Sequence, residues 1–196
     1  MQHYGAPTRL LDFTYSVYVA AYFALERATS ESGPTGCEVW AINTLWARKS
    51  VAAMFTKDSD EWKYITATPQ SEDDQEKGLS KFIMTSNPKR LVLIINPFRR
   101  NERLLIQRGV FAIPGDIEMS FEENLSTFNP TSSEHVARIK IPANLRNEGI
   151  ELLYNMGISR ASLFPGLDGF SQSLRYTMPL VLQKIIDQEK ALWRNG

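Results

Sequence analysis

Segments with strand patterning and segments with helical periodicity follow one another in no regular order along this chain of 196 residues. The strand candidates are 9–13, 37–42, 91–95, 110–113 and 136–141. The helix candidates are 17–27, 44–55, 143–156, a piece near Ser159, and a terminal helix over 167–192, kinked or broken around Pro179. Because no β-α-β rhythm links these segments, they predict an α+β fold rather than a doubly wound α/β fold, in one domain over residues 1–196.

Three stretches between and within these segments carry more specific expectations. Residues 56–89 are polar and acidic, so we expect a long surface connection with one or two helical turns. The run 91–95 is the most apolar short stretch, which predicts a central, buried strand that ends at Pro97. Residues 103–106 fit a further turn or strand before Gly109.

Thr14 or Ser16 is expected to cap the helix over 17–27.

The charge balance and the apolar runs exclude several classes of protein. Twenty-two Lys and Arg residues balance 22 Asp and Glu residues, so the chain lacks the overall positive charge typical of nucleic-acid-binding proteins, although a small local patch remains compatible with these numbers. The longest apolar run, 17–25, is about half of what a membrane-spanning helix needs. No secretory signal opens the chain, and the single Cys37 excludes an intrachain disulfide. We therefore expect a cytoplasmic protein that does not enter a membrane.

Several familiar catalytic motifs do not occur in the sequence. It contains no P-loop, G-x-G-x-x-G, H-E-x-x-H or C-x-x-C pattern, so Walker-type nucleotide hydrolysis, Rossmann redox chemistry and structural zinc lose their usual support. The two histidines, His3 and His135, lie far apart, and we expect no metal site. Cys37 opens a strand candidate without a basic neighbour, which indicates a buried small apolar residue rather than a nucleophile.

Polar side chains gather around a Gly/Pro turn at the start of the chain. A helix start preceded by hydroxyl groups offers unpaired N–H groups to an anion, and an arginine can clamp an anion through two parallel hydrogen bonds. The alternative is that Arg9 and Asp12 form an ion pair that holds the turn. The residues that we expect to line one binding concavity are His3, Tyr4, Arg9, Asp12, Thr14 and Ser16.

The same segment resembles a known family. The run QHYGAPTRLLDFT at 2–14, followed by VAAYFA at 19–24, is similar to the central signature of the FRG domain, which is named for a Phe-Arg-Gly motif N-terminal to this point. Residues 103–111 (RLLIQRGVF) and 163–169 (LFPGLDG) fit the same family, so the resemblance covers essentially the whole chain. The chain begins after the Phe-Arg-Gly segment, and we therefore expect a domain that lacks its N-terminal part.

The chain also shows a more distant similarity to mono-ADP-ribosyltransferases of the Arg-Ser-Glu class, and this similarity implies a specific chemistry. It implies a mixed β core flanked by helices, with Phe13-Thr14-Tyr15-Ser16 and the following helix as the second element of that class. Glu102 and Gln107 are the candidates for the third, catalytic element, although both also fit a solvated turn before a strand. A carboxylate there stabilises the oxocarbenium-like transition state as nicotinamide leaves, whereas Gln107 supplies no charge.

The resemblance thus implies NAD as substrate and an activity of ADP-ribosyl transfer or NAD cleavage, with a protein or nucleic-acid acceptor that the sequence does not identify. It also implies a toxin, stress or defence setting. The alternative is a non-catalytic FRG module that keeps the fold and binds a nucleotide or a protein partner.

Overall fold

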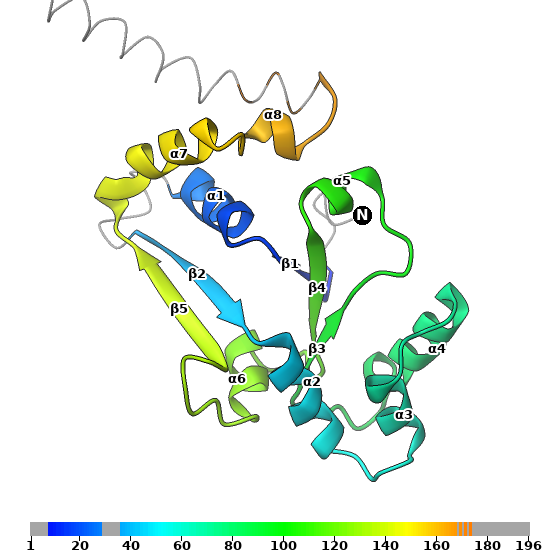
Figure 1. Cartoon of the computed structure of the whole chain (residues 1–196). Coiled ribbons are helices and arrows are strands. Elements are labelled where there is room, and N and C mark those ends of the chain that lie inside the picture. Colours follow the sequence, from blue (N-terminus) through cyan, green and yellow to red (C-terminus); the bar gives the residue numbers. More distant parts are fainter. Residues whose placement is uncertain (1–7, 29–35, 168, 170, 172, 174–196) are drawn as a thin grey trace, which may run out of the picture.

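Two antiparallel sheets and a set of short helices make up the part of the chain that the computed structural model describes, residues 8–28, 36–167, 169, 171 and 173. The larger sheet has the order β1 (Leu11–Thr14), β4 (Gly109–Pro114), β3 (Val92–Ile95), and the smaller sheet pairs β2 (Cys37–Ile42) with β5 (Val136–Ile141). Every strand pairing among these residues is antiparallel. The predicted α+β class is confirmed (Figure 1).

Strand β3 lies at the edge of its sheet, so the prediction that 91–95 forms the central strand is wrong; β4 holds the centre. Burial on both faces explains the apolar run. Leu93 and Ile95 pack in a core cluster with the helices that follow β2, and Val92 packs on the other face with Ala112 and Leu125. A strand covered on both faces reads as apolar throughout, whether or not it has two strand neighbours.

Residues 56–89 contain two helices, α3 (Asp60–Thr66) and α4 (Glu72–Ile83), where the sequence predicted a surface connection with one or two helical turns. The hydroxyl groups of Ser59 and Ser71 accept hydrogen bonds from backbone N–H groups of the first turns and so cap both helices. Ile65 and Phe82 reach the core beside Val51 of α2 (Thr44–Ala53). Each helix buries only a narrow apolar side, which the acidic composition conceals.

A short helix, α5 (Glu102–Ile106), stands where the sequence predicted a turn or strand. The side chain of Asn101 accepts a hydrogen bond from the backbone N–H of Leu104 and starts this helix. The backbone of Arg108 has a φ of 50°, in the left-handed region, which reverses the chain before Gly109 opens β4. Helix α5 is therefore held directly above one end of the larger sheet.

Helix α1 (Val17–Arg27) packs against α7 (Arg146–Asn155) and α8 (Arg160–Leu163) at one end of the molecule, and α2, α3 and α4 lie at the other end (Figure 1). The Ser16 side chain accepts a hydrogen bond from Val19 N, which confirms Ser16 as one of the two predicted caps. The described residues also contain two smaller elements, α6 (Phe121–Ser126) and the 3-10 turn η3 (Ala143–Leu145). The predicted helix over 167–192 lies almost entirely outside the described residues.

No helix in the described ranges combines the length and the apolar character that crossing a membrane would require.

Candidate functional site

Strand β1 and helix α5 meet at the end of the larger sheet. The hydroxyl group of Thr14 donates a 2.7 Å hydrogen bond to the backbone carbonyl of Gln107, and the backbone N–H of Tyr15 donates to the carbonyl of Arg108 at 3.0 Å. Thr14 also lies opposite Gly109 in the strand register. The structure thus brings Thr14 and Gln107 together, although 93 positions separate them in the sequence.

The polar side chains at this junction already form hydrogen bonds with backbone groups of the protein. The amide of Gln107 donates to the carbonyl of Leu163 at 3.0 Å, which ties α5 to α8. The Thr14 hydroxyl accepts from the backbone N–H of Ser16 at 3.0 Å, and Ser16 caps α1. These three side chains therefore fix the geometry of the junction, while the side-chain oxygen of Gln107 and the hydroxyl hydrogen of Ser16 form no hydrogen bond with the described residues.

Arg9 forms no ion pair with Asp12. Its two terminal nitrogens donate to the carbonyls of Ile83 at 2.9 Å and Gly115 at 3.2 Å, and so join the end of α4 to the end of β4. Its Nε is buried and has no hydrogen-bond partner among the described residues. Arg9 thus binds the protein backbone through the same nitrogens that a bidentate anion clamp needs.

Two other arginines, Arg103 of α5 and Arg160 of α8, approach the ring of Phe164. Each guanidinium carbon lies 4.4 Å from the ring centroid, within the range of cation–π attraction. Arg160 forms a 2.6 Å ion pair with Glu26, whose side chain is 9% exposed and also accepts from the Tyr22 hydroxyl at 3.0 Å. The structure therefore builds a charged cluster from α1, α5, α8 and the residue that follows α8.

The two arginines of this cluster differ in their partners. The side chain of Arg103 has no hydrogen bond or ion pair to any described residue, and the Nε atoms of both arginines are buried without a partner in that part of the chain. Burial lowers the pKa of Arg103, the charge of Asp12 opposes that shift, and the like charge of Arg160 adds to it. Arg103 is thus a partly buried cation whose donors are not used within the described structure.

The two remaining acidic candidates occupy different settings. Asp12 lies on β1, is exposed, and contributes a favourable charge to Arg103 without direct contact. Glu102 is the first residue of α5; it is exposed and forms no side-chain hydrogen bond with the described residues. His3 and Tyr4, which we expected in the same concavity, lie outside the described residues.

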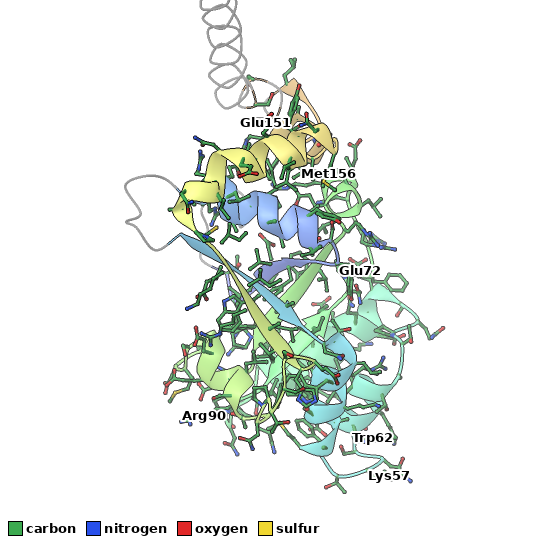
Figure 2. The ribbon with its side chains drawn as sticks, turned by 60° about the vertical axis from the view of Figure 1, so that its left-hand side comes forward. Lys57, Trp62, Glu72, Arg90, Glu151 and Met156 are labelled. Carbon is green, nitrogen blue, oxygen red and sulfur yellow. The ribbon has the colours of Figure 1, made fainter. Side chains whose placement is uncertain are left out.

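Sequence reasoning missed Arg103, Arg160 and Phe164 as parts of one cluster. The available signal is that the two later family-like stretches begin at Arg103 and include Phe164. Nothing in the local sequence marks Glu26, which looks like the polar end of an apolar helix, as the partner of a residue 134 positions away. Figure 2 shows this end of the molecule, where Glu151 and Met156 label α7, opposite the end that carries Lys57, Trp62 and Arg90.

A second feature, a pocket of about 320 Å³, opens between α6 and the smaller sheet. The guanidinium of Arg138 covers the Trp40 ring at 4.0 Å from its centroid and pairs with Glu122 at 2.8 Å across the pocket. None of the predicted site residues that the structure describes lines this pocket. Within the described ranges, no three His, Cys, Asp or Glu side chains gather as metal ligands.

Comparison with known proteins gives a match to a family model. No curated protein and no solved structure matches the chain. The model of the FRG domain matches residues 1–33, a stretch that includes β1 and α1. The match stops well before α5, so the likeness of 103–111 and 163–169 to the same family stays a prediction. The N-terminal stretch of this protein carries the signature of the FRG domain, as its residues predicted.

Proposed function

We propose that this chain binds a nucleotide of the NAD class beside the junction of β1 and α5. The observation that carries the proposal is the hydrogen bond from Thr14 to the carbonyl of Gln107, because it joins the FRG-like strand to α5. This contact gathers polar and charged groups from two distant parts of the sequence at the end of one sheet. Such convergence of a few polar groups at the edge of a scaffold is typical of small-molecule sites.

The groups at this junction fit the chemistry of an NAD-class ligand. A dinucleotide offers negative phosphate oxygens, ribose hydroxyl groups and flat rings. Arg103 provides guanidinium donors without a partner among the described residues, and the exposed carboxylate of Asp12 can accept hydrogen bonds from ribose hydroxyls. These side chains therefore match an NAD-class ligand in their charge and in their hydrogen-bonding groups.

Catalysis is the second candidate function, and the exposed carboxylate of Glu102 favours it. In ADP-ribosyl transfer the bond between nicotinamide and the ribose C1′ breaks with its electron pair on nicotinamide, and an acceptor oxygen or nitrogen bonds to C1′ and loses a proton. Glu102 would stabilise the positive charge that develops on the ribose. Water as the acceptor gives NAD cleavage instead of transfer.

We favour nucleotide binding over catalysis because the candidate catalytic side chains are not positioned to act on a bound substrate. Glu102 has no hydrogen bond within the described residues that fixes its orientation, and preorganisation is what makes a charge effective in a transition state. The amide of Gln107 is engaged with Leu163. A non-catalytic nucleotide-binding module is thus the interpretation that the side-chain contacts support best.

Calorimetric titration of the full chain with NAD, ADP-ribose and, for comparison, free nicotinamide tests binding. We expect NAD and ADP-ribose to bind and to raise the melting temperature, because a ligand that binds only the folded state stabilises it by mass action. Absence of both heat and shift at millimolar NAD and ADP-ribose would exclude the proposal. Chromatographic detection of released nicotinamide then separates catalysis from binding alone.

A pair of threonine variants tests the junction itself. Thr14→Val keeps the shape of the side chain and removes the bond to Gln107, so we expect weaker NAD binding as α5 loses one of its two hydrogen bonds to the end of β1. Thr66→Val is the matched control, because the Thr66 hydroxyl bonds within α3 to the Trp62 carbonyl at 2.8 Å. Equal NAD affinity in the two variants would show that the junction does not hold the ligand.

A further inference from the structure

The arginines around Phe164 come from two separate helices and carry the same charge. Arg103 lies on α5 and Arg160 on α8, and each guanidinium carbon is 4.4 Å from the centre of the one ring. Two partly buried cations on a shared apolar surface repel each other unless anions compensate them. The structure provides a direct counter-charge for one of them, the Glu26 carboxylate that pairs with Arg160 at 2.6 Å.

Arg103 lacks a comparable partner among the described residues. It forms no ion pair with Asp12, and no carbonyl or side chain of the described structure accepts a hydrogen bond from its guanidinium. A guanidinium presents its donors in a rigid planar fork that matches two oxygens of a phosphate. A buried polar group without a partner is exceptional in native proteins, and a bound ion is one of its ordinary explanations.

The surroundings hold Arg160 in place before any anion arrives, and the ring of Phe164 lies against both guanidinium groups. The Tyr22 hydroxyl donates to Glu26 at 3.0 Å, Glu26 holds Arg160, and Phe164 supports both guanidinium groups. The amide of Gln107 fixes the backbone just before Phe164 through the carbonyl of Leu163. Donors that are positioned in advance lose less entropy on binding, which favours a specific anion site over a loose charged surface.

We infer that Arg103 and Arg160, which both lie against the ring of Phe164, form a binding site for the phosphate groups of a ligand, with a pyrophosphate group as the class that engages the guanidinium fork of Arg103 and the Nη2 donors of Arg160, whose Nη1 pairs with Glu26. This inference rests on the proposed function and identifies the anion-binding residues of that site. Arg9, which the sequence offered as a candidate anion clamp, holds two carbonyls with its terminal nitrogens. The shared chemistry is that of a phosphate oxygen, whether it belongs to an inorganic anion or to a nucleotide.

Isothermal titration of the full chain with inorganic pyrophosphate, inorganic phosphate and NAD tests the inference. We expect pyrophosphate to bind more tightly than phosphate, and both affinities to fall as the salt concentration rises. Arg103→Gln should weaken pyrophosphate binding at least tenfold. Arg103→Lys keeps the positive charge over the ring but loses the planar fork, so we expect a clear loss in this variant as well.

The control variant is Arg90→Gln. Arg90 is an arginine on the far end of the molecule from α7, and its Nε is 3.9 Å from the nearest Asp116 oxygen. We expect pyrophosphate affinity to stay within twofold of the original value. Circular dichroism of each variant establishes that it is folded, and Arg103→Lys carries the test if Arg103→Gln does not fold. Equal affinity of the original chain, Arg103→Lys and Arg90→Gln for pyrophosphate would overturn the inference.

The outcomes separate this inference from the proposed function. Pyrophosphate binding that depends on Arg103, without any NAD binding, would support the anion site and exclude the NAD-class ligand. NAD binding that is unchanged in both Arg103 variants would support the proposed function and overturn the anion site. Failure of pyrophosphate, phosphate and NAD to bind the original chain at millimolar concentration would overturn both.

Discussion

Arginine side chains fasten the ends of helices in this protein. Arg9 donates to the carbonyl of Ile83 at the end of α4, and Arg146 donates to the carbonyl of Leu25 near the end of α1. Arg48 donates to three carbonyls at the end of α3. The last carbonyls of a helix have no partner within the helix, so a cationic donor there both satisfies them and complements the helix dipole. Several arginines of this electrically neutral chain thus form hydrogen bonds with backbone carbonyls rather than with a ligand.

Arg9→Ala tests this structural role. The variant loses two hydrogen bonds from a charged donor and leaves the carbonyls of Ile83 and Gly115 unpaired, so we expect the free energy of unfolding to fall by about 2–4 kcal/mol. Urea denaturation followed by circular dichroism measures the loss. Arg90→Ala is the control, because its side chain is 54% exposed and its contact with Asp116 is 3.9 Å, so it should lose less than about 1 kcal/mol. Similar losses in both variants would contradict a fastening role for Arg9.

The elements that the sequence predicted well are those with a regular sequence pattern. Helix α1 and strands β2 and β5 have their predicted bounds because helical spacing and the alternation of apolar and polar residues mark them, although β5 contains no buried residue. Helix α4 was missed because Phe82 and Gly78 are the buried residues in a strongly acidic segment. Helix α5 was missed because it has five residues and no buried side chain, so no periodicity could identify it.

Gly78 of α4 packs directly against the ring of Tyr64 in α3, and Gly78→Ala tests that contact. A Cβ atom at this position would lie 1.9 Å from a ring carbon of Tyr64, which itself packs on Phe82. Alanine in a helix normally gains about 0.5–1 kcal/mol over glycine, whereas overpacking costs about 1–3 kcal/mol. We expect a net destabilisation of about 1–2 kcal/mol in thermal or urea unfolding.

Gly149→Ala in α7 is the matched control for that substitution. The nearest atom to its added Cβ is the flexible end of Leu25, at 2.8 Å, which can move aside more easily than a packed ring. We expect Gly149→Ala to be close to neutral. A stabilised Gly78→Ala variant would show that α3 and α4 separate without cost.

Across the whole molecule, contacts between distant parts of the chain hold α8 against α1 and α5. The pair Glu26–Arg160 spans 134 positions, and the hydrogen bond from Gln107 to Leu163 spans 56. Family resemblance pointed to the meeting of β1 with α5, since it placed Thr14 and Gln107 in one site. It gave no indication of Glu26–Arg160, because the pairing depends on how α1 and α8 pack and not on any local pattern.

The Glu26–Arg160 pair therefore offers a test of how this end of the molecule is held together. Arg160→Met removes the charge while keeping a long, unbranched side chain, so it leaves a carboxylate that is 9% exposed without its cation. An uncompensated buried charge typically costs about 3–5 kcal/mol, and we expect Arg160→Met to lower the free energy of unfolding at pH 7 by that order.

The double variant Glu26→Gln with Arg160→Met separates the charge effect from lost packing. The amide introduced by Glu26→Gln would keep an acceptor for the Tyr22 hydroxyl while carrying no charge, so most of the stability lost in Arg160→Met should return. Chemical denaturation of the original chain, both single variants and the double variant gives the interaction energy of the pair, which we expect to exceed about 1 kcal/mol. If the two single losses simply add in the double variant, α8 is held by the packing of Leu163 and Phe164 in the apolar cluster and not by the ion pair.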